Sequence, residues 1–281
     1  MKRSIILFSL TLLLILAQAA GVSSYAEPPG EGRVGCPHCK NDGSEISQRL
    51  QKADELYASL KSKEALKELQ MVLQLDPQNH EALSKSARVY IDFGDMVPES
   101  EPDWQAKRLK QYRIAEDLAR KALKADPNST WGHFYVAVSL GKIASLSPIS
   151  KQLDLAEEMR DEVEKAIAMD PKNAYAYAVY GIWQRKMGEI GKMSRAFASL
   201  VWHSVPQGSL EKSAEYLKKS ISLDPTVIMS HLELGTTYIA MGKWQLARNS
   251  LKAALDLPPQ FSDDGANKKA AQRLLDEIKD R

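Results

Sequence analysis

An Asp-Pro dipeptide recurs along the chain, each time at the end of a stretch with helical hydrophobic periodicity. The four copies are Asp76-Pro77, Asp126-Pro127, Asp170-Pro171 and Asp224-Pro225, and Leu257-Pro258-Pro259 is a degenerate fifth copy. Proline fixes φ and lacks an N–H, so it cannot continue a helix but can open the next one. Punctuation of this kind predicts stacked helical hairpins.

The last of these units fits a repeat of about 34 residues without adjustment. Gly235 and Ala254 are small at the positions where the two helices of a hairpin cross closely, and Gly242 supplies the turn between the helices. The full set of packing positions, counted from Ile228, is Leu234, Gly235, Tyr238, Ala247, Leu251, Ala254 and Pro259. In this set the chain resembles the tetratricopeptide-repeat (TPR) family, over roughly residues 46–259.

The earlier units are longer than the last one. Successive Asp-Pro copies lie 50, 44 and 54 residues apart, and the excess is predicted to form intra-repeat insertions at about residues 95–110, 144–153 and 190–208. The final stretch Asn267–Ile278 has apolar residues on one helical face, which suits a capping helix. We therefore predict an all-α, TPR-like α-solenoid of about five helical hairpins over residues 46–281, closed by a C-terminal capping helix.

The N-terminus has the layout of a signal peptide. Lys2 and Arg3 precede an apolar run over residues 5–16, and small residues follow, which predicts a signal peptide over residues 1–26 with cleavage after Ala19 or Ala26. A helix over the run would be about 18 Å long, against about 30 Å for the apolar core of a bilayer. Extending it to Val22 gives about 27 Å. The predicted location is periplasmic or secreted, and a membrane anchor formed by residues 5–22 is the alternative.

The charge balance argues against nucleic acid as a partner. Removal of residues 1–26 takes away two of the 38 basic residues and no acidic residue, which leaves 36 of each sign. A sequence-independent nucleic-acid binder needs a basic excess to neutralise phosphates. We therefore expect a protein or peptide partner, and a membrane only if the N-terminal segment is not cleaved.

Residues 27–45 are predicted to be a flexible Gly/Pro linker, and they contain Cys36-Pro37-His38-Cys39. A Cys-x-x-Cys pair in an oxidising compartment favours a local disulfide between Cys36 and Cys39. A redox or metal-handling role and a pair of free thiols are the alternatives. A zinc site would need a second pair of ligands, and the chain has no other cysteine. We predict no metal and no cofactor.

No catalytic site is predicted. The five histidines are scattered, with none at the i, i+4 spacing of a helical metal site, and the chain has no Gly-rich phosphate loop and no Gly-x-Ser-x-Gly motif. The sequence therefore indicates a binding protein and not an enzyme.

In a TPR hairpin, positions 2, 5, 9, 12 and 13 of the first helix line the concave groove. In the middle units these positions combine aromatic and basic side chains, a composition that favours anchoring of a peptide. The predicted peptide-binding groove consists of Arg88, Trp131, Phe134, Lys142, Tyr175, Arg185 and Lys186. The alternative is that superhelical curvature or the insertions bury the aromatic side chains as core.

A second resemblance is carried by Gly181-Ile182-Trp183, by residues 194–198 (Ser-Arg-Ala-Phe-Ala) and by residues 205–214, which begin Val-Pro-Gln-Gly-Ser. Over about residues 128–278 the chain resembles the regulator of microtubule dynamics family. The resemblance implies a TPR-like helical domain that acts as a protein-binding module. Animal members are associated with microtubules, the spindle, mitochondria and the endoplasmic reticulum, so microtubules are a partner that the resemblance implies.

Overall fold

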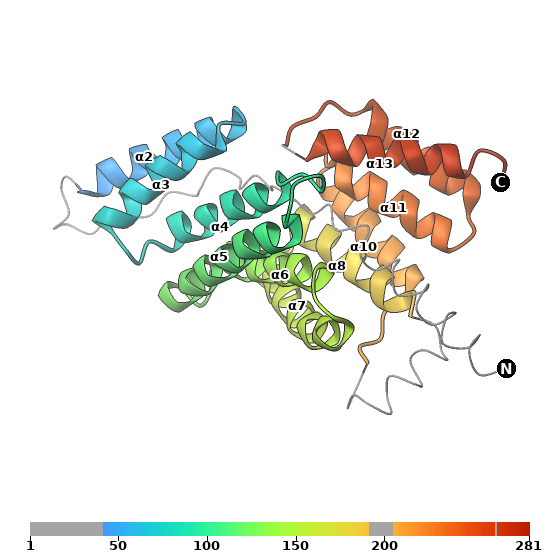
Figure 1. Ribbon diagram of the computed structural model, residues 1–281, viewed down its shortest axis with the longest axis horizontal. Coiled ribbons are helices and arrows are strands. Elements are labelled where there is room, and N and C mark those ends of the chain that lie inside the picture. The colour runs from blue at the N-terminus through green and yellow to red at the C-terminus, as the bar shows by residue number, and fades with distance from the viewer. Residues whose placement is uncertain (1–41, 191–204, 262) are drawn as a thin grey trace. The chain divides into compact units, whose positions relative to one another are not determined.

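A computed structural model describes residues 42–190, 205–261 and 263–281, and every regular element in these residues is a helix (Figure 1). The helices are α2 (Asp42–Ala58), α3 (Ser62–Leu75), α4 (His80–Asp95), α5 (Trp104–Ala125), α6 (Thr130–Ser145), α7 (Ile149–Met169), α8 (Ala174–Gly188), α10 (Leu210–Leu223), α11 (Ile228–Ala240), α12 (Trp244–Asp256) and α13 (Asp264–Glu277). The all-α prediction is confirmed. The predicted signal peptide and most of the linker lie outside the described residues, but α2 begins at Asp42, so residues 42–45 are helical and not linker.

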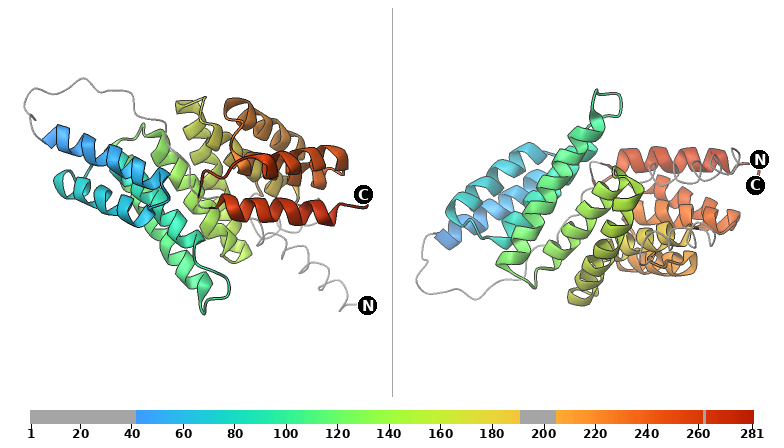
Figure 2. Two further views of the ribbon diagram at one scale, coloured as in Figure 1. Left: turned by 90° about the horizontal axis from the view of Figure 1, so that it is seen from above. Right: turned by 60° about the horizontal axis from the view of Figure 1, so that its bottom comes forward.

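Four of the predicted hairpins each pack within one unit, namely α2 with α3, α4 with α5, α8 with α10, and α11 with α12, and α6 precedes α7 in the chain. Two compact units divide them: one holds α2 to α5 and α6 as far as Ser139, and the other holds α6 from Leu140 and α7 to α13. In the first unit α3 packs between α2 and α4 (Figure 2). In the second unit α13 packs against both α11 and α12, which confirms the capping helix. None of the described helices is long and apolar enough to span a bilayer.

The Asp-Pro dipeptides form the turns between hairpins, and each aspartate makes hydrogen bonds through its backbone and its side chain. The Asp76 N–H closes α3 by donating to the Val72 carbonyl at 2.8 Å, and Asp76 Oδ1 accepts from the Gln78 N–H at 3.1 Å. The aspartates of the other three turns accept the equivalent bond from Asn128, Lys172 and Thr226 at 2.9–3.1 Å. In each turn the aspartate side chain thus accepts from the backbone N–H just beyond the proline.

Polar side chains just after the proline then start the next helix. Asn79 Oδ1 accepts from the Ala82 N–H at 3.0 Å, and Asn173 Oδ1 accepts from the Ala176 N–H at 3.0 Å. These are N-cap bonds, which satisfy donors at the start of a helix. The repeated four-residue turn therefore ends one helix and begins another.

Close approach of the two helices in a hairpin explains the small residues. A Cβ built on Gly235 would lie 2.7 Å from the Leu251 side chain, and one on Gly181 would lie 2.7 Å from Leu217. Carbon atoms do not approach this closely, so glycine is needed where α11 crosses α12 and where α8 crosses α10. Gly242 has a φ of +70°, as the predicted turn between α11 and α12 requires.

The predicted insertions lie largely within helices. Helices α5 and α7 have 22 and 21 residues, whereas the second helices α3 and α12 have 14 and 13. The α4–α5 connection is limited to residues 96–103, and α7 already begins at Ile149. From Trp104 and from Ile149 onward, the residues of the first two predicted insertions therefore form the first turns of α5 and α7. Most of the third insertion, residues 191–204, lies outside the described residues.

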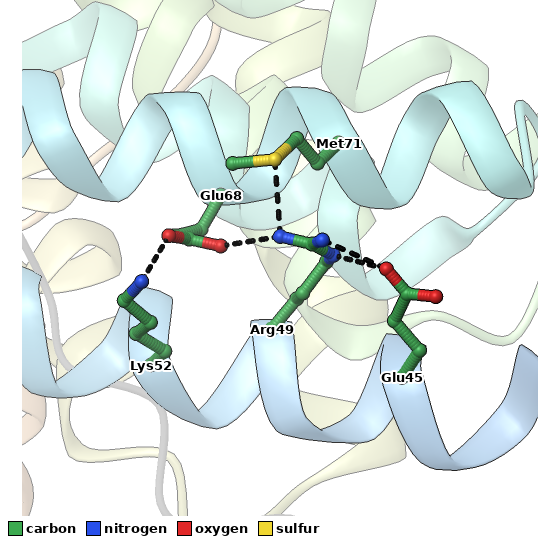
Figure 3. A network of polar contacts seen from close by, with 5 residues as sticks. All are labelled: Glu45, Arg49, Lys52, Glu68 and Met71. Atoms are coloured by element: carbon green, nitrogen blue, oxygen red, sulfur yellow. Dashed lines mark hydrogen bonds and ion pairs between the residues drawn. The ribbon is translucent and has the colours of Figure 1, made fainter.

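A polar network joins α2 to α3 in the first hairpin (Figure 3). The buried Glu68 carboxylate accepts from Lys52 Nζ at 2.6 Å and from Arg49 Nη1 at 3.0 Å, and Arg49 also pairs with Glu45 at 2.7 Å. Arg49 Nη1 lies 3.0 Å from Met71 Sδ as well. The hydrogen bond from Lys52 is the main cause that lowers the pKa of Glu68, against the opposing effect of burial. The carboxylate is thus held in its charged form between the two helices.

Candidate functional site

Arg88, a predicted groove residue, is buried in α4 with 3% of its surface exposed. Its guanidinium carbon lies 3.7 Å from the centre of the Tyr57 ring, and Nη2 lies 3.6 Å from an Asp54 carboxylate oxygen. Both partners belong to α2, the first helix of the preceding hairpin. An aromatic ring face and a carboxylate offset part of the free-energy cost of burying the cation.

Further polar contacts join α2 and α4 around Arg88. Lys85, also buried, forms ion pairs with Asp54 and with Glu81, the latter at 3.1 Å. The Tyr57 hydroxyl donates to the fully buried Asp92 carboxylate at 2.6 Å. The cations of α4 are therefore neutralised by neighbouring side chains, and they are not exposed to an incoming peptide.

Arg185 on α8 is buried in a comparable way, with 2% of its surface exposed. It pairs with Glu233 of α11 at 2.5 Å and with Glu189 at 3.1 Å. Burial, the largest influence, acts to lower the pKa of Arg185, but the Glu233 and Glu189 carboxylates outweigh it and the net shift is upward. Arg185 therefore stays charged inside the second unit.

Two more predicted groove residues, both on α6, are also buried. Phe134 has none of its surface exposed, and Lys142 has 1% exposed. Phe134 packs edge-on against Trp131, with ring centres 5.5 Å apart, and at 5.1 Å from Tyr135. Phe134 therefore packs as a core aromatic residue, which agrees with the alternative interpretation that the aromatic side chains are buried.

Four of the predicted groove residues, Arg88, Phe134, Lys142 and Arg185, are therefore buried, and their role in peptide binding stays a prediction. For Arg88 and Arg185 the physical reason is that the first helix of a neighbouring hairpin brings a carboxylate against the buried guanidinium. The carboxylates that accept these cations, Asp54 and Glu233, were missed as partners. Opposite charges on the first helices of neighbouring units were the available signal.

Trp131, Tyr175 and Lys186 keep part of their surface exposed. Trp131 and Tyr175 each occupy the second residue of their first helix, α6 and α8 respectively. Lys186 has a lowered pKa, first because of burial and second because the Arg185 cation lies nearby. These three residues are the part of the predicted groove that solvent reaches, and their role in peptide binding stays a prediction.

Cys36 and Cys39 lie outside the described residues, so their disulfide stays a prediction. Within residues 42–190, 205–261 and 263–281, no three His, Cys, Asp or Glu side chains are grouped as metal ligands. His133 and His231 each place Nε2 near the carbonyl of a turn proline, at 3.0 and 2.9 Å. They therefore act in the turns between hairpins.

Comparisons with known proteins agree with the repeat architecture. Regulator of microtubule dynamics protein 1 of Bos taurus is 27% identical over 239 residues, which are 84% of this chain and 73% of the relative. Protein 3 of Xenopus laevis is 25% identical over 236 residues, 82% of this chain and 50% of the relative. A crystal structure of a thermophilic TPR protein of Thermus thermophilus aligns with a TM-score of 0.59 at 17% identity and covers 81% of this chain and 99% of its own.

The structural match supports the TPR fold alone, because its sequence identity is low. The family model described as regulator of microtubule dynamics protein 1-3 matches residues 49–279, which is most of the chain. The chain is therefore a TPR-like member of the regulator of microtubule dynamics family.

Proposed function

We propose that the protein is a non-enzymatic scaffold that binds a protein or peptide partner through its first helices. The observation that carries this proposal is that Trp131 and Tyr175 occupy equivalent positions in the first turns of α6 and α8 and are only partly buried. A large aromatic side chain that is already ordered contributes binding area at a small entropic cost.

The packing around Trp131 supports its use as an anchor. Its ring stacks on Tyr135 with centres 5.8 Å apart and meets Phe134 edge-on at 5.5 Å. The buried rings hold the indole in one orientation and leave part of it to solvent. In the second unit, Lys186 supplies a partly exposed cation on the same helix as Tyr175.

Site-specific photo-cross-linking tests the proposal. A photoreactive phenylalanine analogue at position 131 or 175 of the full chain is expected to capture a partner in cells. The same analogue at Gln245, an exposed residue on the second helix α12, is the matched control.

With the captured partner, Trp131→Ala is expected to weaken binding on the order of tenfold or more. Trp244→Ala, on α12, should leave affinity unchanged. If the partner bound wild type, Trp131→Ala and Trp244→Ala with equal affinity, the first-helix site would be excluded.

We also propose that the protein is exported to the periplasm or secreted, supported by the charge and apolar pattern of residues 1–26. Mass spectrometry of the protein from its native host should find a mature N-terminus at Ala20 or Glu27. An intact Met1 would favour the membrane anchor formed by residues 5–22.

A link to microtubules is a second candidate function, and the names of the relatives favour it. Co-sedimentation of the full chain with purified microtubules tests it directly. An intact N-terminus together with saturable co-sedimentation would favour this candidate over export. A cleaved N-terminus without co-sedimentation would favour export.

A further inference from the structure

An open surface groove lies along α5, and all of its described lining residues belong to this helix. It is lined by Ala106, Leu109, Lys110, Arg113, Ile114 and Asp117. These residues recur at intervals of three and four, so they form one stripe on the helix. The stripe lies opposite Tyr112, Ala115 and Ala119, the buried residues of the same helix. Helix α5 therefore packs into its hairpin with one side and offers a lined groove with the other.

Most of the charges near this groove are paired. Lys107 pairs with Glu101 at 2.5 Å, and Arg108 donates to the Val97 carbonyl at 2.8 and 3.0 Å. Asp117, the acidic residue of the lining, pairs with Lys121 at 2.7 Å. The groove's own acid is thus already neutralised.

Lys110 and Arg113 differ from these neighbours. Both are exposed, they are three residues apart on one helix face, and neither forms an ion pair with another described residue. Leu109 and Ile114 lie beside them, half-buried. The groove therefore combines two cations that have no ion-pair partner among the described residues with two accessible aliphatic side chains.

We propose that the α5 groove docks an acidic, amphipathic peptide segment of a partner protein. Carboxylates of the segment pair with Lys110 and Arg113, and its apolar side chains pack on Leu109 and Ile114. The charge complementarity selects an acidic occupant, and the aliphatic residues on either side of the cations select one that also carries apolar side chains. The proposal rests on the proposed scaffold function and adds a second site on a different face.

A peptide fits this surface better than an anionic membrane does. Binding to a membrane surface needs a broad apolar face that enters the lipid. Here the apolar contribution is limited to two half-buried aliphatic residues and Ala106, and the nearby Trp104 lies under the Arg108 guanidinium at 4.6 Å. These few side chains along one helix give a contact surface of the size that a short peptide segment covers.

Fluorescence anisotropy with three labelled peptides of equal length tests the proposal on the full chain. The first contains Glu and Leu at helical spacing, the second replaces Glu by Lys, and the third replaces Leu by Ser. The Glu/Leu peptide is expected to bind at least about tenfold more tightly than either of the others, because each lacks one of the two required contacts.

The variant Lys110→Glu/Arg113→Glu should weaken binding of the Glu/Leu peptide by about tenfold or more. The matched control is Lys63→Glu/Lys67→Glu, which makes the same charge change at two exposed lysines on α3. Its affinity should stay within about twofold of the wild-type value. Circular dichroism should give the same helicity for all three proteins.

Equal weakening by the two double variants would overturn the proposal, because the effect would then be one of net charge. Equal binding of the three peptides would also overturn it. Binding of phosphatidylserine vesicles that depends on Lys110 and Arg113, without binding of the Glu/Leu peptide, would replace the peptide by a membrane. If the partner cross-linked at Trp131 binds the α5 variant normally and the peptide does not bind, the scaffold function stands and this inference fails.

Discussion

Arg88 in α4 and Arg185 in α8 are both buried cations, but the side chains that compensate their charge differ. Arg88 stacks on the Tyr57 ring and shares the Asp54 carboxylate, whose side chain is 38% exposed. Arg185 pairs instead with Glu233, whose side chain is 5% exposed. In both places a first-helix cation meets the first helix of a neighbouring hairpin, but only α8 and α11 bury both members of an ion pair.

The difference in exposure determines what each site loses when its carboxylate is removed. Around Arg88, water reaches Asp54, and Lys85 keeps a second partner in Glu81. Around Arg185, the remaining acid is Glu189, whose side chain is 29% exposed and lies on one side of the guanidinium. A buried charge without compensation is far more costly than a partly hydrated one.

The largest expected effect is therefore at Glu233. Glu233→Ala leaves Arg185 buried with an incomplete set of partners, which should lower the free energy of unfolding by about 3–5 kcal/mol. Urea unfolding followed by circular dichroism measures this change. Glu215→Ala, at an exposed position on α10, should change stability by less than about 0.5 kcal/mol. Similar values for the two variants would show that the α8–α11 pair is not important for stability.

The corresponding change at α2 and α4 should cost less. Asp54→Ala removes a partly exposed carboxylate from Lys85 and Arg88, and the expected loss is roughly 1.5–3 kcal/mol. The Tyr57 ring continues to cover Arg88. The same urea titration tests the ordering, and a loss at Asp54 as large as that at Glu233 would contradict the comparison.

A smaller, pH-dependent effect is expected at Glu68 in the α2–α3 network. Its folded-state pKa lies below the ordinary value of 4.5, first because of the hydrogen bond from Lys52. Its stabilising contribution is therefore fully present above about pH 4.5 and is lost as the pH falls through the lowered value. Urea unfolding between about pH 5 and pH 3 should show a weaker acid dependence for Glu68→Gln than for wild type. An unchanged acid dependence would mean that other carboxylates account for it.

The smallest effect on stability is expected at the unpaired cations of α5. Lys110→Glu/Arg113→Glu breaks no ion pair among the described residues, so the free energy of unfolding should stay within about 0.5 kcal/mol of wild type. Thermal unfolding checks this expectation. A clear loss would mean that these side chains stabilise the hairpin, and the docking groove would then need another explanation.

The hairpins could be predicted from the sequence because their signals are local. An aspartate and a proline define each turn within about four residues, and glycine at the helix crossing is required by contact with one side chain, as with Gly235 and Leu251. Both signals are read without knowing what packs on the hairpin from outside.

The groove could be predicted only in part because it depends on contacts between hairpins. The exposure of Arg88 is determined by Tyr57 and Asp54, 31 and 34 residues earlier in the chain. The repeat register gives the helix face on which a residue lies. It does not show how far the neighbouring helix buries that residue. The α5 groove was missed for a similar reason, since residues 95–110 were read as an insertion and not as the start of a long helix.

Some charges of the protein are buried in ion pairs between helices and others are exposed. The contacts that they make should therefore respond differently to ionic strength. Buried ion pairs such as Arg185–Glu233 are screened very little by dissolved salt, whereas exposed charges such as Lys110 and Arg113 are screened over about 10 Å at 0.1 M. Raising the salt concentration should thus release a partner held at α5 while the helical hairpins stay folded. Elution with salt would then release the bound partner while the protein itself stays folded.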